Sequence, residues 1–528
     1  MSRMRKMLCL MAAALITVTA LAGCGGTEVA DTQGSAATQG TVAATTAAAT
    51  DSPKPDISKE VNLKIYCVGD ASPGDGSKLV ADAVNAIIKP KINATISTEY
   101  LPWADWTNKY QLVFASGEEF DGIYTANWSF YQAQATKNGF KEITQEMLDK
   151  YAPSLMADLP EMAWKQAKVN GKLYMIPTTF SEFPTVHFAI REDLKKKYGV
   201  ADIKDLDSFG AYLDAIAKNE KEMVPLNLSV QTNFSDLQQL FNNENEYGVV
   251  GNVAQRNFVY SITDPGASIV DVFQTPGFLE FVKKMYQWKQ AGYWSKNAIS
   301  NKTPSSTSFE NGTSAATITN ILAATNYSYA WPKQHPGWEV QVYDASLGKK
   351  QTGTPYIGSG IGIHATAANP ERLLMFTELA RTDKDLNQLL CYGIKDTHWK
   401  LIGEDQVEYI RGDTKVDYTD GLSWFFRNSK FQLKPSGVYS NYDTIFETAE
   451  QNEVGHILQA FNFDDTNLKN EMAAIGNVVT QYAVPLITGF VEPETGLATL
   501  NAKMKEAGAD KVLAEIKLQA EKYLADNQ

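Results

Sequence analysis

The sequence predicts an α/β protein with two or more lobes, and three observations support this. At 528 residues the chain is longer than a single hydrophobic core usually serves. Hydrophobic residues make up 44% of it and charged residues 21%, a composition typical of globular proteins. After an unusual first tenth, strand and helix patterns alternate, which predicts a parallel, doubly wound sheet with helices on its faces.

The N-terminus is typical of a secretory signal peptide, expected over residues 1–23. Basic residues at positions 3, 5 and 6 precede the apolar run Met7–Ala20, which is shorter than the ~20 residues of a membrane-spanning helix. Leu21–Cys24 then resembles a bacterial lipobox, although an ordinary secretory signal could carry a cysteine there. We expect Cys24 to carry a lipid on the extracytoplasmic face of the cell membrane. Residues 24–56 are small and polar and are expected to form a flexible linker.

The first folded segments alternate regularly. The patterns predict strand Val61–Val68, a helix over residues 77–89, strand Ala94–Tyr100, helix Trp106–Ala115 and strand Phe120–Tyr124. Ligands bind such sheets beyond the carboxyl ends of the strands. Residues 101–106 and 125–131 follow two of these strands, and both segments combine aromatic side chains with hydrogen-bonding ones. They are the first candidates for a binding site.

Weaker patterns continue along the chain. They predict strands at 172–177, 186–190 and 315–318, a strand interrupted by glycines at 356–363, and helices at 209–217, 278–291, 372–380 and 510–524. There is no internal repeat with a fixed period.

Several short motifs follow one another in an order that resembles a known protein family. Ala115–Asp121, Gly171–Pro177 and Asn369–Arg372 follow one another as in the family 1 extracellular solute-binding proteins of ABC transporters, which this chain resembles over residues 60–528. Tyr392–Trp399 and Ala507–Leu524 are similar to a long subgroup with a C-terminal extension. One departure lies at residues 458–463, where the subgroup usually has a Gly-Phe turn.

This resemblance implies a periplasmic-binding-protein-like fold of two α/β lobes, a multi-strand hinge and a helical C-terminal extension. The chain would cross between the lobes near residues 178–186, 318–326 and 358–364. Lobe I is expected to comprise residues 57–180 and 322–360, and lobe II residues 181–321 and 361–528. The resemblance also implies a monomer that delivers a carbohydrate to ABC permease subunits, without a cofactor, a metal or a catalytic residue.

Sugar binding needs flat apolar surfaces for the ring faces and polar side chains for the hydroxyl groups. Loop aromatics with polar neighbours, together with positions that match the family's ligand loops, supply the candidate ligand-binding residues: Trp103, Asp105, Trp128, Ser129, Gln231, Phe234, Asn320, Tyr327, Trp331 and Trp424. Packing in the core is the competing interpretation for each aromatic, and the Trp-Pro sequence at Trp331 also suits a structural corner.

Other classes of function are less well supported. The net charge of −13 argues against nucleic-acid binding, and neither the zinc-protease nor the serine-hydrolase motif is present. A surface-anchored enzyme that degrades glycans stays open, because 61 acidic residues could supply a catalytic pair. A binding protein for a peptide or another polar solute also stays open.

Three smaller signals are expected to be structural. Cys67 and Cys391 are predicted to be buried thiols, with a disulfide as the alternative. His398 in the His-Trp pair is expected to serve the fold. Residues 464–467 carry acidic side chains, but their spacing does not match a calcium-binding EF-hand loop.

Overall fold

The computed structural model describes residues 55–72, 74–179, 183, 185–229, 233–251, 253, 257–410, 415–418 and 421–526. The expected signal peptide, Cys24 and most of the expected linker lie outside these residues. No helix in the described ranges has both the length and the apolar character needed to cross a membrane.

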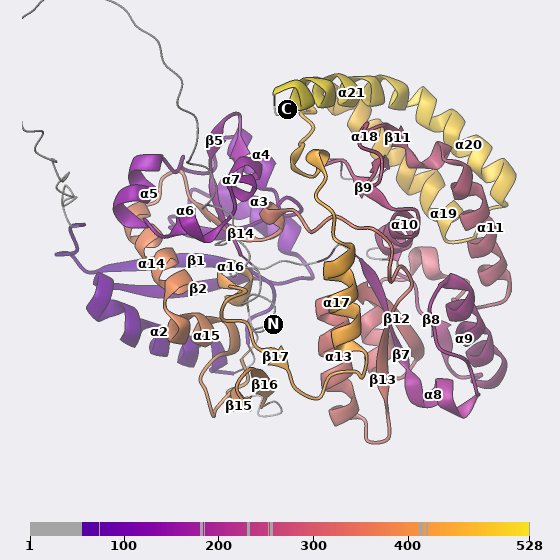
Figure 1. The fold of residues 1–528 in the computed structure, drawn as a ribbon, viewed down its shortest axis with the longest axis horizontal. Coiled ribbons are helices and arrows are strands. Elements are labelled where there is room, and N and C mark those ends of the chain that lie inside the picture. Colours follow the sequence, from indigo (N-terminus) through magenta and orange to yellow (C-terminus); the bar gives the residue numbers. More distant parts are fainter. Residues whose placement is uncertain are drawn as a thin grey trace, which may run out of the picture. The chain divides into compact units, whose positions relative to one another are not determined.

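The first lobe is built on a five-stranded sheet (Figure 1). Its strands, in spatial order, are β2 (Ala94–Leu101), β1 (Val61–Val68), β3 (Gly122–Thr125), β14 (Gly360–Ile363) and β6 (Met175–Pro177). β1 pairs in parallel with β2 and β3, as the alternation of strands and helices predicts. β14 runs antiparallel to both its neighbours, so the sheet is mixed.

Sequence pattern explains the first strand–helix unit. Helix α2 (Gly76–Ile92) buries a side chain every fourth residue, from Val80 through Val84 to Ile88. This spacing places one apolar stripe against the sheet. Asn93 ends the helix in the left-handed conformation, at φ 46°, and its side chain donates to the carbonyl of Ile57. The chain therefore turns directly into β2.

The second lobe contains two sheets. One has the order β13 (Val340–Asp344), β7 (Val186–Arg191), β12 (Ser314–Asn320) and β8 (Val224–Leu226). The other has the order β11 (Ile269–Asp271), β10 (Phe258–Ser261) and β9 (Tyr247–Val249). β7 is buried along its whole length, and Phe188 stacks on Phe209 of helix α9 (Leu206–Asn219) at 3.8 Å between ring centroids.

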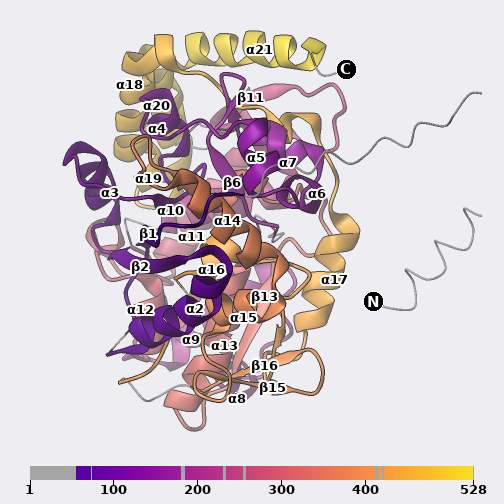
Figure 2. The same ribbon diagram turned by 90° about the vertical axis from the view of Figure 1, so that its left-hand side faces the viewer.

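The C-terminal extension is part of the second lobe. Its helices are α18 (Lys469–Val478), α19 (Val484–Ile487), α20 (Pro493–Glu506) and α21 (Ala509–Asp526), coloured orange-yellow to yellow in Figures 1 and 2. They contribute Ile475, Leu500 and Ile516 to the same hydrophobic core as β7 and α9. At this contact Trp294 donates its indole N–H to the carbonyl of Thr488 at 3.0 Å. The expected helical extension is therefore present and buries much of its apolar surface.

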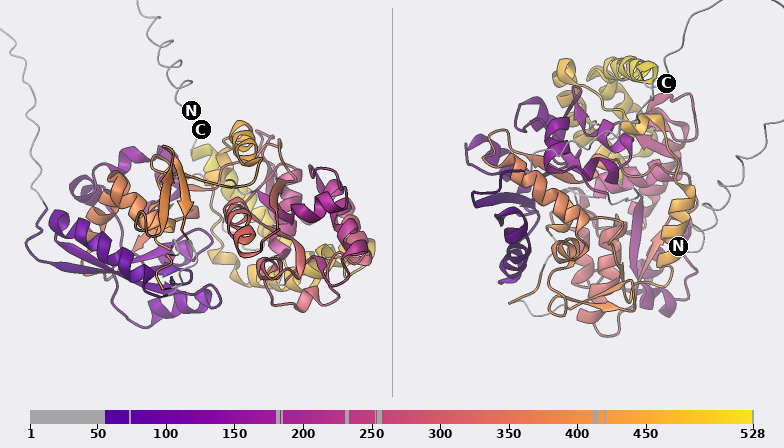
Figure 3. Two further views of the ribbon diagram at one scale, coloured as in Figure 1. Left: turned by 90° about the horizontal axis from the view of Figure 1, so that it is seen from below. Right: turned by 60° about the vertical axis from the view of Figure 1, so that its left-hand side comes forward.

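The chain passes between the lobes three times (Figure 3). The crossings lie between β6 and β7, between β13 and β14, and between β17 (Lys434–Pro435) and helix α17 (Tyr442–Asn452). The first agrees with the expected crossing near residues 178–186. The crossing expected near residues 358–364 lies close to the end of the second one, but there the chain enters the first lobe and not the second. The crossing expected near residues 318–326 is absent, because β12 and β13 lie in one sheet, and the crossing after β17 was not expected.

Two segments therefore fall in the lobe opposite to the expected one. Residues 322–344 belong to the second lobe, because β13 pairs with β7 in its four-stranded sheet. Residues 361–390 and 421–426 belong to the first lobe, where β14 pairs with β3, and Leu373, Leu390 and Phe426 join its core. An alternating strand pattern does not reveal which sheet the strand will join, and this explains the error.

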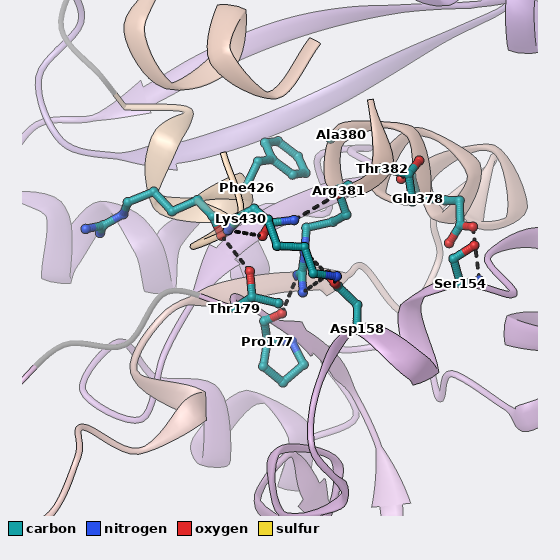
Figure 4. Close-up of polar contacts among 12 residues, drawn as sticks. Ser154, Asp158, Pro177, Thr179, Glu378, Ala380, Arg381, Thr382, Phe426 and Lys430 are labelled. Carbon is teal, nitrogen blue, oxygen red and sulfur yellow. Dashed lines mark hydrogen bonds and ion pairs between the residues drawn. The ribbon is translucent and has the colours of Figure 1, made fainter. Parts of the chain in front are cut away.

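A buried arginine holds the first-lobe ends of two crossings (Figure 4). Arg381 of helix α14 (Pro370–Thr382) donates to the carbonyl of Pro177 at 2.7 Å and pairs with Asp158. Its own carbonyl accepts from the side chain of Asn428 at 2.8 Å, and Lys430 also pairs with Asp158. The end of β6 and the segment after residue 427 are thus fixed to one another through the first lobe.

Candidate ligand-binding site

Four tryptophans gather at one edge of the first sheet. Trp103 and Trp106 follow β2, Trp128 follows β3, and Trp424 lies on the short helix α16 (Ser423–Phe426). The Trp103 ring lies 6.3 Å from that of Trp128, with an angle of 26° between their planes. Trp103 also lies 6.3 Å from Trp424, and Trp106 lies 5.7 Å from Trp128. Because β1, β2 and β3 are parallel, the residues that follow their carboxyl ends meet here.

Two of these rings reach solvent. Trp103 is 44% exposed and Trp128 is 41% exposed, although tryptophan is usually well buried. Trp106 and Trp424 are half-buried and pack on the first-lobe core. The inner pair therefore supports an outer pair whose faces are available. We call Trp103, Trp106, Trp128 and Trp424 the tryptophan platform.

The backbone fits closely around the outer pair. The indole N–H of Trp128 donates to the carbonyl of Gly358 at 2.9 Å. Gly69, just after β1, has φ 127°, and a Cβ there would lie 3.4 Å from Trp103 Nε1. A larger residue at position 69 would be strained and would crowd Trp103. Both rings thus have defined positions.

A segment from later in the chain completes the edge. The amide of Asp75 donates to the carbonyl of Lys415 at 2.8 Å. Gly421 lies so close to Tyr100 that a Cβ would come within 2.8 Å of its ring. This segment leads into α16, where the guanidinium of Arg427 lies 4.5 Å from the centre of the Trp424 ring. The platform therefore includes one positive charge beside an aromatic face.

The two polar candidates beside the platform differ in accessibility. Asp105 is exposed, and its carboxylate accepts from the side chain of Asn108 at 2.9 Å. It can still accept hydrogen bonds from a ligand. Ser129 is fully buried, and its hydroxyl has no partner among the described residues. In this conformation Ser129 cannot reach a ligand, contrary to the sequence-based expectation.

The second-lobe candidates do not assemble into a comparable surface. Asn320 caps helix α13 (Ile321–Gln334), because its side chain accepts from the amide of Ala323 at 2.9 Å. Trp331 is only 4% exposed and stacks on Phe309, so the structure assigns it to the core. Tyr327 stacks on Trp331 at 4.0 Å, and burial raises the pKa of its phenol.

The remaining second-lobe candidates add little. Phe234, on helix α10 (Asn233–Glu244), is half-buried against the second-lobe core. Gln231 lies outside the described residues. Of the ten candidates, the structure brings Trp103, Asp105, Trp128, Ser129 and Trp424 to one place.

Sequence reasoning missed two aromatic members of this site. Trp106 lies in the candidate segment 101–106, three residues after Trp103 and at the start of a helix, but it was not named as a ligand-binding residue. Tyr124 lies within the buried strand β3 (Gly122–Thr125), and its ring lies 5.6 Å from Trp128 and 6.3 Å from Trp424. The spacing of Trp103 and Trp106 was a usable signal. Tyr124 carried none, because a tyrosine within an apolar strand is usually a core residue.

The structure also accounts for the smaller signals. Cys67 and Cys391 are buried and form no disulfide, as predicted. His398 is buried and its Nδ1 accepts from the amide of Ile394 at 2.8 Å, which confirms a structural role. Asp464 accepts from the amide of Thr466 at 3.0 Å and so stabilises a turn. Within the described ranges, no group of three His, Cys, Asp or Glu side chains could hold a metal ion.

The platform offers broad apolar faces, with the buried guanidinium of Arg427 beside Trp424 and the exposed carboxylate of Asp105 at its border. Such a surface can bind a molecule that has flat C–H faces and hydroxyl groups at its edges. No buried acid–base pair that could act on a bound molecule lies among the platform residues described here.

Comparison with known proteins agrees with this architecture. The profile of the bacterial extracellular solute-binding protein family matches residues 82–389. A second profile, a domain of unknown function (DUF3502), matches residues 457–525, which include helices α18–α21. One curated relative, a carbohydrate ABC transporter substrate-binding protein of Streptococcus pneumoniae, is 26% identical over 475 residues, or 88% of this chain and 91% of the relative.

Solved structures share the fold. The N-glycan transport solute-binding protein NgtS of Streptococcus pneumoniae superposes with a TM-score of 0.72 at 22% identity, covering 89% of this chain and 100% of that one. The same protein has been solved in complex with Man1GlcNAc and with Man5GlcNAc. The alginate-binding protein AlgQ2 superposes with a TM-score of 0.59 at 15% identity, over 88% of this chain and 98% of that one. These likenesses confirm the two-lobed α/β architecture.

Proposed function

The chain belongs to the bacterial extracellular solute-binding proteins, and on that premise we propose that it captures a carbohydrate on the tryptophan platform and delivers it to an ABC importer. The observation that carries this proposal is the pair of half-exposed rings, Trp103 and Trp128, held on the half-buried rings of Trp106 and Trp424. The names of the curated relative and of NgtS, whose structures contain Man1GlcNAc and Man5GlcNAc, point to the same ligand class.

Binding would begin on the first lobe. The C–H face of a pyranose ring packs on the indole of Trp128 or Trp103, and the ring hydroxyls reach polar groups such as Asp105. The second lobe then closes over the sugar by rotation about the three crossing segments. Because the rings are already held in place, little side-chain entropy is lost on binding.

This role requires capture and release without chemical change. A glycosidase needs two carboxyl groups on either side of one bond, one of them with a raised pKa. Asp105, an acid beside the platform, is exposed, and its carboxylate accepts a hydrogen bond from Asn108. We therefore propose a binding protein and not an enzyme. Incubation with a bound glycan, followed by mass spectrometry, should return the glycan intact; multiple turnovers would overturn this assignment.

The first test is a glycan array probed with the mature chain, followed by calorimetry on each hit. Man1GlcNAc and Man5GlcNAc are the first defined probes to titrate. Trp128→Ala and Trp103→Ala should each weaken binding by roughly 30-fold, about 2 kcal/mol, as expected for central aromatic contacts. Leu112→Ala is the matched control, because Leu112 is 65% exposed on helix α3 (Trp106–Ala115), which also carries Trp106, and is not one of the platform residues.

Two results would contradict the proposal. One is the absence of any glycan hit together with tight binding of a peptide or another polar solute. The other is a glycan that binds with unchanged affinity in both tryptophan variants, which would place the ligand elsewhere.

We also propose that Cys24 anchors the protein to the membrane and keeps it beside its permease. The lipobox-like Leu21–Cys24 supports this, and it implies an extracytoplasmic protein on a tether of about 30 residues. Cys24→Ser should release the protein from the membrane fraction or block processing. Normal processing with unchanged membrane association in that variant would contradict the anchor.

A further inference from the structure

Trp128 is bonded to a turn that ends one of the crossing segments. Its indole N–H donates to the carbonyl of Gly358 at 2.9 Å, and the backbone amide of Asn127 donates to the carbonyl of Ile357 at 2.8 Å. The turn Pro355–Ser359 contains the short helix η3 (Tyr356–Gly358) and leads directly into β14. One side chain of the platform is thus attached to the chain between the lobes.

The same turn has three more attachments, all in the first lobe. The hydroxyl of Tyr124 lies 3.0 Å from the hydroxyl of Ser359 and 3.3 Å from the carbonyl of Gly358. The amide of Tyr356 donates to the side chain of Gln166 at 2.8 Å. The amide of Thr178, which begins the first crossing, donates to the carbonyl of Ser359 at 3.0 Å. Two crossings therefore meet at this turn.

The preceding residues of the same segment are bound to the second lobe. The backbone of Gln351 exchanges hydrogen bonds with Asn452 and Val454, at 3.2 and 2.8 Å. The carbonyl of Gly353 accepts from the side chain of Gln459 at 2.7 Å. The residues up to Gly353 are thus bonded to the second lobe, and the turn that starts at Pro355 is bonded to the first. This crossing would therefore pivot at the bond between Thr354 and Pro355.

Trp103 provides an internal comparison. It lies on the same platform with nearly the same exposure, 44% against 41%. Its indole N–H has no hydrogen bond to another described residue, and its close backbone neighbour is Gly69, which belongs to the first lobe alone. Of the two exposed rings, Trp128 is the one bonded to a crossing segment.

We propose that Trp128 has a second role, as the link between the ligand surface and the crossing segments, through the Gly358 carbonyl. The functional part of this inference rests on the proposed carbohydrate binding. A sugar that stacks on Trp128 restricts its indole and hence the turn Pro355–Ser359, which favours one position of the pivot. Occupancy of the platform and the angle between the lobes are then coupled, because a ligand shifts such an equilibrium by its different affinity for the two states.

The test needs no ligand. The Trp128 side chain is replaced by its benzothienyl analogue, which keeps the shape of the ring and lacks the N–H. The matched control carries the same analogue at position 103. Hydrogen exchange then reports the amides of Asn127 and Thr178, both of which donate into the turn. We expect exchange three- to tenfold faster for the analogue at 128 and unchanged exchange for the analogue at 103.

A second measurement follows the lobes. Nitroxide labels at Ala86→Cys on α2 and Ala514→Cys on α21 report the interlobe distance, in a mature chain with Cys24→Ser. The native Cys67 and Cys391 are buried and should not react. The analogue at 128 should broaden the ligand-free distance distribution, and the control should leave it unchanged.

Equal exchange rates and equal distance distributions for the two analogues would overturn the link. Because both measurements use the ligand-free protein, this outcome is distinct from failure of the proposed function, which is the absence of any bound glycan. Faster exchange at the turn without a broader distance distribution would also refute coupling to the lobes and leave Trp128 as a locally positioned ring.

Discussion

Arg381 and Asp158 form a buried ion pair at the base of two crossing segments, with Nη2 3.0 Å from Oδ2 and side-chain exposures of 0% and 8%. Burial lowers the pKa of the guanidinium, but arginine remains charged at any pH of interest. The buried guanidinium therefore needs the Asp158 carboxylate as its charged partner. The network around it (Figure 4) also uses the carbonyls of Pro177 and Arg381 itself.

Removing the acid should destabilise the protein more than removing the base. Asp158→Asn leaves a fully buried positive charge with a neutral partner, and we expect a loss of ~3–5 kcal/mol in the free energy of unfolding. Arg381→Met should be milder, because Asp158 keeps Lys430. Lys430→Met is the control and should change stability by less than about 1 kcal/mol, since Lys430 is largely exposed. Urea denaturation measures all three, and similar losses for Asp158→Asn and Lys430→Met would contradict this ranking.

The C-terminal extension should be required for folding of the second lobe. Its side chains belong to the same core as β7 and α9, so a chain that ends at residue 455 exposes that core. We expect the shortened chain to aggregate or to lose its cooperative thermal transition. A soluble chain with a native-like melting temperature would show that the extension is an independent domain.

One hydrogen bond at this contact gives a graded version of the test. Trp294→Phe removes the donor to the Thr488 carbonyl and should cost ~1–3 kcal/mol beyond the loss of ring volume. Trp288→Phe removes the same volume from the same core, where the described residues include no partner for its N–H. The difference between the two variants in chemical denaturation isolates the hydrogen bond.

Local patterns predicted the first half of the site well. β1, β2 and β3 lie where alternation placed them, and a parallel sheet brings Trp103 and Trp128 together by geometry alone. Trp424 was expected at the site from resemblance and not from pattern, because 296 residues separate it from Trp128 in the chain. It reaches the platform because the segment after residue 415 packs on Asp75 and Tyr100. A pattern of neighbouring residues cannot predict a contact between segments that lie so far apart in the sequence.

The second-lobe candidates Asn320, Tyr327 and Trp331 have local structural roles that the sequence could have indicated. Asn320 precedes a helix, and asparagine is a preferred residue at that cap position. Tyr327 and Trp331 are four residues apart, so they share one face of that helix and stack on each other. Residues 320–331 have the pattern of a helix cap followed by an apolar stripe, and this pattern predicts a helix that packs in the core. The resemblance to a sugar-binding family favoured the other interpretation.

The stability of the second lobe should depend on pH through Asp271. Burial raises the pKa of its carboxyl to about 7, against ~4 for an exposed aspartate. Between these values the folded state holds a proton that the unfolded state has lost, so stability falls as pH rises from about 4 to 7 and then levels off. Asp271→Asn should flatten that slope in denaturation curves measured across this range.

Glu244 provides a check on this prediction. Burial raises its pKa to about 7 as well, so Glu244→Gln should remove a separate share of the same slope. In the double variant, the share of the pH dependence of the unfolding free energy that comes from Asp271 and Glu244 should be gone. Equal slopes for the native chain and D271N would mean that Asp271 is ionised in the folded protein.

Two tryptophans with opposite burial should separate binding from stability. Trp331→Ala empties a core site that is 4% exposed, and we expect a loss of ~3–5 kcal/mol in the free energy of unfolding. Trp128→Ala removes a ring that is 41% exposed and should lower stability much less, while weakening glycan binding by about 2 kcal/mol.

Thermal melting with and without glycan, beside calorimetry, measures both effects. The two variants should differ because a half-exposed ring leaves no closed cavity when it is removed. Trp331→Ala should retain the native intrinsic affinity in the fraction that stays folded. A large loss of ligand-free stability for Trp128→Ala with unchanged affinity would assign Trp128 to packing, and the platform would then bind through Trp103 alone.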